Sequence, residues 1–158
     1  MADSARVKTV MGERDPLRED AIVLDKLRIV FGPKEVLKDI SLVVPRGEVL
    51  VIMGLSGTGK STTLRSIAGL LRPTSGTVLV NGHSIPDLKP NELELLRRRI
   101  GFCFQHGALF DSMTVGQNVA FGLREHTKLP EAEIQRIVAE KLAIVEQPAL
   151  EVEGLDLV

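Results

Sequence analysis

Between residues 54 and 61 the chain reads Gly54-Leu55-Ser56-Gly57-Thr58-Gly59-Lys60-Ser61, which matches the phosphate-loop pattern G-x-x-x-x-G-K-[ST] at every position. In such a loop the glycines allow backbone angles and a close approach that a Cβ would prevent. The loop N–H groups and the positive end of the following helix attract phosphate oxygens. The pattern therefore predicts a binding site for the phosphate tail of a nucleoside triphosphate.

The polar positions of this loop have separate expected tasks. Lys60 should reach the β- and γ-phosphates, the Ser61 hydroxyl should ligate Mg²⁺, and Thr62 should help to hold the α-phosphate side. The alternative is a glycine-rich turn between a strand and a helix, but a chain of this length meets the pattern by chance with a probability of roughly half a per cent. The expected phosphate-binding residues are Gly54, Leu55, Ser56, Gly57, Thr58, Gly59, Lys60, Ser61 and Thr62.

The segments on either side of the loop have a strand pattern and a helix pattern. Glu48–Met53 is a nearly unbroken apolar run, typical of a strand covered on both faces. A helix is expected from about Lys60, and Arg72–Gly76 should end it. Its apolar residues at helical spacing, which predict the buried stripe, are Leu64, Ile67, Ala68 and Leu71.

Short β-prone runs precede this strand–loop–helix unit, and helical patterns follow it. The β-prone runs are Ala21–Leu24, Leu27–Phe31, Val36–Leu37 and Ser41–Val44, with turns expected at Gly32-Pro33 and at Pro45-Arg46-Gly47. Downstream, Thr77–Val80 and Asn81-Gly82 predict a strand and a tight turn. Together these patterns predict an α/β nucleotide-binding core that carries an additional antiparallel β sheet and a helical appendage.

The C-terminal third contains one short strand pattern between helices. Leu93–Arg99 predicts a short basic helix, and Ile100–Phe104 predicts a buried strand in which Cys103 is an inert core thiol. Helices are also expected at Val115–Arg124 and Glu131–Val145, with Pro130 in the first turn of the latter. The expected buried face of that helix consists of Ile134, Val138, Leu142 and Val145.

The composition excludes several classes of protein. Lys+Arg 20 against Asp+Glu 21 gives a net charge of -1, so nucleic acid is not an expected partner. The absence of Trp and Tyr removes most aromatic platforms for single-stranded nucleic acid. One cysteine excludes an internal disulfide framework and fits a reducing compartment. Residues 1–20 are polar and predict a flexible lead-in. They contain no apolar core of signal-peptide length, and with the single cysteine this predicts a cytosolic protein.

The flanks of the loop carry a resemblance to a known family. The segments are Phe31–Ser41, Pro45-Arg46-Gly47-Glu48, Leu70–Gly76, Val80-Asn81-Gly82 and Arg97–Gln105. From about Ile22 onward they closely resemble, in the same order, the N-terminal portion of the ATP-binding subunit of an ABC transporter. The resemblance implies a P-loop NTPase core with an antiparallel β subdomain and a partial α-helical subdomain. It places the β subdomain and core up to about residue 105, and the helical subdomain at about 105–158.

Two single residues take on roles through this resemblance. Phe31 stands where the family has an aromatic residue that stacks on adenine, and the alternative is a core Phe at the end of a strand. Gln105 matches the family's Q-loop glutamine, whose side-chain carbonyl can meet Mg²⁺ and the attacking water. The alternative for Gln105 is an ordinary polar residue at the end of a strand.

The segment Gly107–Leu123 is similar to ATPases of lipid-asymmetry systems, which work with lipid-shuttling MCE-type proteins. In that family the surface after the Q-loop receives a coupling helix from the membrane subunit. Leu109, Phe110 and Met113 are suitable apolar contacts for such a helix. The alternative is that they pack inside the helical appendage itself.

Several motifs of the family are absent from the 158 residues. No LSGGQ-like signature and no downstream switch histidine is present. The nearest approach to a Walker B strand is Leu142–Pro148 followed by Gly154-Leu155-Asp156, but the helical period from Glu131 continues through Val145. We expect the chain to be truncated or a fragment that ends before the signature, and hydrolysis by this polypeptide alone to be negligible.

The remaining polar candidates favour an ordinary surface. His83, His106 and His126 lack ligand-like spacing, so a structural metal site is not expected. Arg97–Arg99 is expected to be a solvated helix face rather than a nucleic-acid patch.

The resulting hypothesis is an ATP-binding subunit of an ABC transporter, which binds ATP and Mg²⁺ and drives transport, with phospholipid or another lipid as cargo. The resemblance implies transmembrane permease subunits, a second ATP-binding subunit as a homodimer partner, and a position on the inner face of the cell membrane. Two alternatives stay open: a soluble ABC ATPase that acts without a membrane partner, and a nucleotide-binding module that does not hydrolyse ATP.

Overall fold

The computed structural model describes residues 19–105 and 107–145. The chain divides into two compact units, Met1–Phe102 and Cys103–Val158, and each is described by itself. The expected lead-in at residues 1–20 falls almost entirely outside the described residues.

The first unit is built on an antiparallel sheet of four strands in the order β2-β1-β3-β4. The strands are β1 (Asp20–Phe31), β2 (Lys34–Pro45), β3 (Ser75–Val80) and β4 (His83–Ser84). The β-prone runs expected along residues 21–44 merge into the two long strands of one hairpin, in which Phe31 pairs with Lys34. Turns occur at residues 32–33, 46–47 and 81–82, so the turn predictions are confirmed.

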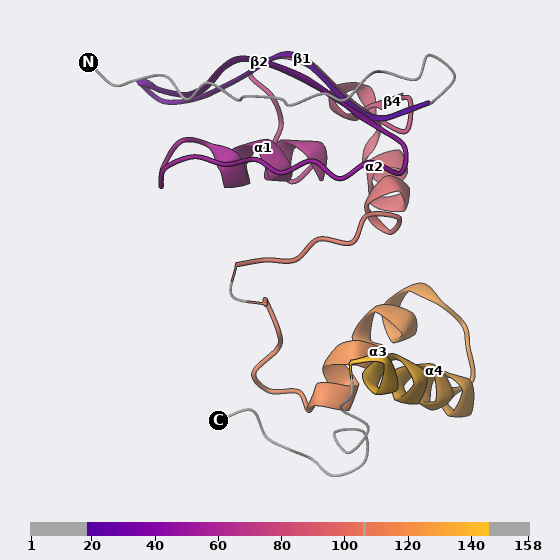
Figure 1. The fold of residues 1–158 in the computed structure, drawn as a ribbon. Coiled ribbons are helices and arrows are strands. Elements are labelled where there is room, and N and C mark those ends of the chain that lie inside the picture. Colours follow the sequence, from indigo (N-terminus) through magenta and orange to yellow (C-terminus); the bar gives the residue numbers. More distant parts are fainter. Residues whose placement is uncertain (1–18, 106, 146–158) are drawn as a thin grey trace. The chain divides into compact units, whose positions relative to one another are not determined.

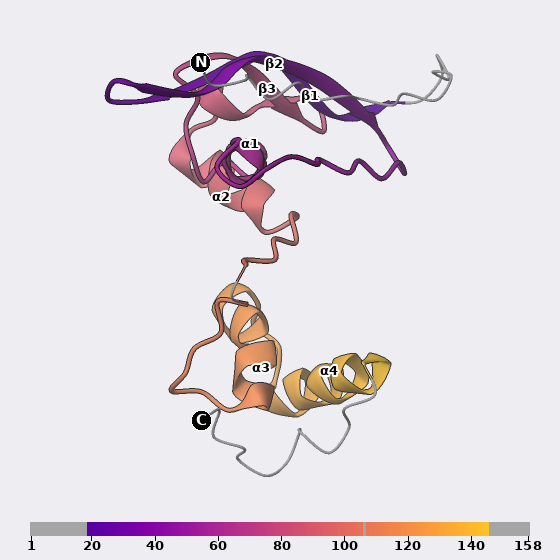
Figure 2. The same ribbon diagram turned by 60° about the vertical axis from the view of Figure 1, so that its left-hand side comes forward.

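The helices α1 (Lys60–Ile67) and α2 (Pro90–Arg97) lie on one side of this sheet (Figure 1 and Figure 2). A 3₁₀ helix, η1 (Ile85–Asp87), follows β4. The buried core joins apolar side chains from the sheet, η1 and α2, so that the helices close one face of the sheet. Its members are Leu24, Leu27, Ile29, Leu37, Leu42, Val44, Val78, Val80, Ile85 and Leu96.

The prediction of a strand at Glu48–Met53 is wrong. Residues 48–55 form an extended segment that pairs with none of the described strands. Val49 and Met53 are 89% and 83% exposed, whereas Leu50 packs against the core. A strand that is buried on both faces requires neighbours on both edges and cover on both sides, and the described part of the chain covers one side only.

The predicted buried stripe of α1 is partly wrong. Leu64 is 48% exposed, and the buried residues of the helix are Thr63 and Ser66. The burial of these small side chains costs little because their hydroxyls bond to carbonyls of the helix itself, from Thr63 to Gly59 at 3.1 Å and from Ser66 to Thr62 at 3.0 Å. The helix also ends earlier than expected, at Ile67, followed by Gly69 at φ +67.

The predicted strand at Ile100–Phe104 is absent, and these residues form irregular backbone. Cys103 is exposed, so the prediction of a core thiol is wrong. The reason is the same as for residues 48–53: an apolar run becomes a buried strand only where other strands supply hydrogen bonds.

The second unit contains α3 (Val115–His126) and α4 (Glu131–Ile144), which pack together as a helical pair. Both helix predictions are confirmed, and Pro130 is the N-cap of α4 rather than a first-turn residue. The shared core consists of Ala120, Ile134, Val138 and Leu142, with Val115 and Leu123 partly buried against it. Val145 is 61% exposed, because α4 ends at Ile144; its expected burial is therefore wrong. No helix in the described ranges is long and apolar enough to cross a membrane.

Candidate nucleotide-binding site

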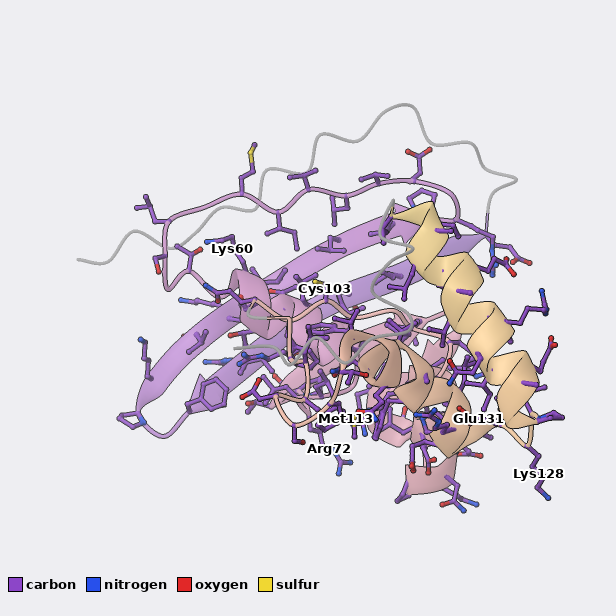
Figure 3. The ribbon with its side chains drawn as sticks, turned by 90° about the horizontal axis from the view of Figure 1, so that it is seen from below. Lys60, Arg72, Cys103, Met113, Lys128 and Glu131 are labelled. Carbon is purple, nitrogen blue, oxygen red and sulfur yellow. The ribbon has the colours of Figure 1, made fainter. Side chains whose placement is uncertain are left out.

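The Lys60 side chain folds back over the glycine-rich loop that precedes α1 (Figure 3). Its Nζ donates hydrogen bonds to the backbone carbonyls of Gly54 and Leu55, both at 2.7 Å. An ammonium group has three N–H donors, so two of them hold Gly54 and Leu55, the first two residues of the loop. The charge and the third donor are the means by which Lys60 could bind an anion.

A second set of bonds closes the same loop. The Thr58 hydroxyl donates to the Leu55 carbonyl at 2.9 Å, and the Thr58 N–H donates to the same oxygen at 3.4 Å. A Cβ on Gly54 would lie 3.0 Å from this hydroxyl oxygen, so glycine at position 54 leaves Thr58 room to bond. The Leu55 carbonyl thus accepts from both Thr58 and Lys60, and the loop is held from both ends.

Gly59 joins the loop to helix and sheet. It is the N-cap of α1 with φ 94° and ψ 6°, a backbone conformation that side chains other than hydrogen disfavour. A Cβ at this position would lie 2.5 Å from Cδ2 of Leu37 and 3.2 Å from the Val36 carbonyl oxygen, both on β2. Gly57 also has a positive φ, +81°, but a Cβ there would meet nothing within 4 Å. Gly59 is therefore required by packing as well as by backbone angle.

The start of α1 presents hydroxyl groups to solvent. Ser61 is exposed and Thr62 is half-buried, whereas the next hydroxyl, of Thr63, is buried and bonded to the Gly59 carbonyl. The first N–H groups of an α-helix have no carbonyl partner within the helix. Ser61 and Thr62 thus combine free side-chain oxygens with the positive end of α1.

These features fit a phosphate group and a hydrated Mg²⁺ ion. The loop offers a cation at Lys60, glycines with positive φ at positions 57 and 59, and the start of a helix. Mg²⁺ keeps several waters and binds through one or two protein oxygens plus substrate phosphates, which the single Ser61 hydroxyl can satisfy. Among the described residues no group of three or more His, Cys, Asp or Glu could hold a metal ion.

Phe31 lies at the end of β1, where it pairs with Lys34 across the hairpin turn. Its side chain is 50% exposed, and it is not a member of the buried core. The alternative of a core Phe is therefore wrong. An exposed ring at a strand end is available for stacking on a planar ligand.

Gln105 belongs to the second unit, where it is exposed in a turn. Lys60 and Ser61 belong to the first unit, so the structure leaves the joint role expected for Gln105 and these residues as a prediction. The neighbouring His106 lies outside the described residues, while His83 and His126 are exposed. Leu142–Ile144 are helical, which confirms the helical interpretation there; the rest of the Walker B-like stretch, residues 146–158, lies outside the described residues.

The loop between Gln105 and α3 exposes apolar side chains. Leu109 is 57% exposed and Phe110 44% exposed, while Met113 is half-buried. The Phe110 ring packs on the Phe121 ring of α3, with centroids 4.6 Å apart and an interplanar angle of 49°. None of Leu109, Phe110 and Met113 belongs to the buried core of the helical pair.

One residue of this region, Asn118, was not singled out in the sequence analysis. Asn118 makes side-chain hydrogen bonds to three residues of the preceding loop. The sequence signal was present as Thr114 and Gln117, the S/T-x-x-E/Q pattern of a capping box, which the structure forms. Such a box marks a helix start, and a short polar residue just inside it can reach back to the loop.

The first unit also contains an open hollow apart from the loop. His83, Leu88, Glu92, Leu95, Leu96 and Arg99 line an open hollow of about 240 Å³. Arg97, Arg98 and Arg99 are all exposed, as expected, but α2 ends at Arg97 and Arg98 is its C-cap, so they do not form one helix face. Arg97 also donates to the Gly69 carbonyl, and Arg98 pairs with Glu94 at 2.5 Å.

A phosphate loop that opens a helix packed on an antiparallel sheet, with a separate helical pair, defines an ATP-binding cassette of the P-loop NTPase type. A family profile described as "ABC transporter" matches residues 37–155, three-quarters of the chain, and the chain belongs to this family. Its fold is similar to an ATP-binding cassette, MJ0796, solved as a dimer in a post-hydrolysis state with ADP and Pi. That similarity has a TM-score of 0.76 at 30% identity and covers 87% of this chain and 62% of the other.

Curated relatives point the same way. The chain is 47% identical over 125 residues to a probable ribonucleotide transport ATP-binding protein, Mkl, of Mycobacterium tuberculosis, covering 79% of this chain and 35% of the relative. It is 45% identical over 114 residues to the ATP-binding protein MlaF of an intermembrane phospholipid transport system in Escherichia coli K12, covering 72% of this chain and 42% of MlaF. The chain thus spans less than half the length of these two relatives.

Proposed function

We propose that residues 54–62 bind the phosphates of Mg–ATP and that the protein is the ATP-binding subunit of an ABC transporter. The observation that supports this most directly is the Lys60 ammonium, held 2.7 Å from the carbonyl oxygens of Gly54 and Leu55. The charge of this ammonium and its third N–H donor are the groups proposed to meet the β- and γ-phosphates. The positive end of α1 adds to the attraction.

Ser61 is the residue that would hold Mg²⁺ in the first unit. When bound, Mg²⁺ neutralises charge on the β- and γ-phosphates. The exposed Ser61 hydroxyl can donate an oxygen ligand, and Thr62 can approach the α-phosphate side. Gln105 is the second proposed Mg²⁺ contact, through its side-chain carbonyl, and Lys60 and Gln105 are the two proposed catalytic residues of this chain. Phe31 is proposed to stack on adenine.

The domain boundaries are proposed on the family pattern. Residues 21–158 would form the N-terminal portion of the nucleotide-binding domain, with the β subdomain and core up to about 105 and the helical subdomain at about 105–158. Residues 1–20 would be a lead-in.

The activity of the whole protein is proposed as ATP hydrolysis that drives transport. The partners would be transmembrane permease subunits and a second copy of the ATP-binding subunit, on the inner face of the cell membrane. The similar MJ0796 cassette was solved as a dimer, which supports the pairing. Leu109 and Phe110, exposed beside Gln105, are the proposed contacts for a helix of the permease.

A phospholipid or another lipid is the proposed cargo. The proposal rests on the segment Gly107–Leu123 and on the phospholipid transport system named for MlaF. The named cargo differs among relatives: the Mkl proteins carry a ribonucleotide name, and a CysA protein of Synechocystis, 41% identical over 130 residues, carries a sulfate/thiosulfate name. The test is ATP-driven transport in vesicles that contain the full-length protein and its permease subunits. The cargo is the compound, among phospholipid, ribonucleotide and sulfate, whose transport depends on ATP.

The 158-residue chain is proposed to bind ATP without hydrolysing it at a normal rate. The reason is chemical: no LSGGQ-like signature is present in the sequence, and no residue has been identified that could act as the general base. Phosphate release at an ordinary turnover rate from the purified chain would contradict this proposal.

The test of phosphate binding is a titration of the 158-residue chain with Mg–ATP, Mg–ADP and adenosine. We expect affinity to fall in that order, because the loop binds the phosphate tail rather than the nucleoside. Equal affinity for ATP and adenosine would overturn the assignment of residues 54–62. A parallel titration with Mg–GTP tests the contact with the base. We expect an affinity similar to that for Mg–ATP, because stacking on Phe31 is largely indifferent to base identity.

A further inference from the structure

Asn118 forms a side-chain clamp on the loop that precedes α3. Its Oδ1 accepts a hydrogen bond from the Phe110 N–H at 2.8 Å. Its Nδ2 donates to the carbonyl oxygens of Phe110 at 3.2 Å, Met113 at 3.1 Å and Thr114 at 3.0 Å. A primary amide has two N–H hydrogens, so the three acceptors share them. Asn118 therefore bonds both the N–H and the C=O of Phe110, as a neighbouring strand would.

This clamp is separate from the cap that starts the helix. The Thr114 hydroxyl accepts from the Gln117 N–H at 3.2 Å, and the Gln117 side chain accepts from the Thr114 N–H at 3.0 Å. The capping box thus satisfies the helix start without Asn118. Asparagine is a poor helix former because its side chain competes for backbone groups. Its position in the first turn of α3 is explained by the loop that it reaches, eight residues back.

Phe110 is held at both its backbone and its aromatic ring. Asn118 holds the Phe110 backbone, and Phe121, one turn further along α3, packs on the Phe110 ring. A backbone bond from the Met113 N–H to the Phe110 carbonyl, 3.0 Å, closes the loop between them. Phe110 is nevertheless 44% exposed and its neighbour Leu109 is 57% exposed. The loop is thus fixed to α3, while the side chains of Leu109 and Phe110 stay partly exposed.

We propose that Asn118 is a positioning residue that sets the conformation of residues 109–114 before the permease binds. The inference rests on the proposed function, which makes Leu109 and Phe110 the contacts for a permease helix. A surface that is already ordered loses less conformational freedom on binding than one that must fold against its partner. Asn118 itself is half-buried beneath the loop and acts through Phe110.

The local test uses amide hydrogen exchange on the 158-residue chain. We expect Asn118→Ala to speed exchange of the Phe110 amide at least tenfold, while the amides of the second half of α3 and of α4 exchange as in the wild type. Asn118→Asp keeps the acceptor for Phe110 but faces three carbonyl oxygens without a donor, so the same loop loses protection. Gln117→Ala is the matched control: it breaks the capping box and speeds exchange at the helix start, and leaves Phe110 within twofold of the wild type.

The functional test uses the full-length protein with the permease subunits that co-purify with it. We expect Asn118→Ala and Phe110→Ala each to lower permease retention at least fivefold, with Mg–ATP affinity unchanged, and Gln117→Ala to retain the permease. Unchanged Phe110 exchange in both Asn118 variants, or equal loss of protection throughout α3 and α4, would overturn the positioning role alone. Retention of the permease by Phe110→Ala would overturn the proposed docking surface, whatever the exchange rates show.

Discussion

Gly59 lies against Leu37 so closely that a Cβ on Gly59 would be 2.5 Å from Cδ2 of Leu37. This approach seats the start of α1 on strand β2, and the phosphate loop ends at the same point. The position of the loop therefore depends on a contact between residues 22 positions apart in the sequence.

The first prediction compares two glycines of the loop. Gly59→Ala should destabilise the first unit by about 2–5 kcal/mol, from a strained positive φ and from overpacking against β2. Gly57→Ala, which has φ +81° but no neighbour within 4 Å, should cost only about 1–3 kcal/mol for the backbone strain. Urea unfolding curves of the two variants measure the difference. Equal losses would mean that the contact with Leu37 contributes nothing.

The second prediction concerns Lys60. Lys60→Ala should weaken Mg–ATP binding at least about tenfold, because a charge-assisted hydrogen bond to phosphate is lost. The loop should also exchange its amide hydrogens faster, since the bonds to Gly54 and Leu55 disappear. Lys128→Ala removes the same charge from the connection before α4 and serves as the control in calorimetric titrations. Wild-type affinity in Lys60→Ala would mean that the phosphate site lies elsewhere.

The third prediction concerns adenine. Phe31→Ala should lower Mg–ATP affinity by about 5–150-fold, which corresponds to the loss of about 1–3 kcal/mol of base stacking. Leu95→Ala removes a similarly exposed apolar side chain of the first unit, 60% exposed, and should leave the affinity unchanged. The affinity for inorganic triphosphate, which has no base, should be the same in all three proteins. A matching drop for triphosphate would show that Phe31 supports the loop instead of the base.

The fourth prediction concerns the ion pair between Arg124, in the last turn of α3, and Glu131, the first residue of α4. Glu131 is labelled in Figure 3. A hydrogen bond from Arg124 lowers the pKa of Glu131, and a second from Gln135 lowers it further. The Arg124–Glu131 distance is 2.5 Å. A carboxylate with a lowered pKa stabilises the fold above its unfolded pKa, about 4.3, and this contribution is lost as the pH falls through the folded pKa.

Acid melting curves and carboxylate NMR titrations test this link. Arg124→Gln should raise the pKa of Glu131 toward its ordinary range and flatten the loss of helical stability in acid. Lys128→Gln removes a positive charge nearby without touching the hydrogen bond, and the Glu131 titration should stay close to that of the wild type. An identical shift in both variants would assign the effect to general charge and not to the Arg124 contact.

The fifth prediction follows from the exposure of the single cysteine. Cys103 should react with a thiol reagent such as DTNB in the folded 158-residue chain at a rate close to that of the unfolded chain, because its side chain is exposed among the described residues. Labelling that requires denaturant would contradict the exposed position.

Local signals in the sequence predicted much of the candidate site. The spacing of Gly54, Gly59 and Lys60 indicated the phosphate loop, and the structure shows a helix starting at Lys60. The position of the loop against β2 could not be predicted, because the contact between Gly59 and Leu37 depends on how two distant segments fold together. The Asn118 clamp was likewise hidden, since an asparagine after a capping box gives no signal of the residue it reaches.

The two failed strand predictions share one physical cause. Val49 and Met53 were expected inside a strand, and Cys103 inside another, because apolar residues favour burial. Burial requires a partner surface, and the described residues supply none at those places. Leu64 was expected in the core for a different reason, its helical spacing, but the buried side chains of α1 are Thr63 and Ser66. Their hydroxyls bond to carbonyls of the same helical segment, so their burial leaves no hydroxyl without a partner.

What the sequence determined by itself is the set of features that depend on neighbours in the chain: the glycine loop, the turns, the helix at Lys60 and the separate helices α3 and α4. Short-range hydrogen bonds and side-chain spacing decide these. Only the tertiary structure decided which apolar residues are covered, how Gly59 meets Leu37, and which loop Asn118 holds, because each of these depends on a contact between residues that the chain brings together only when it folds.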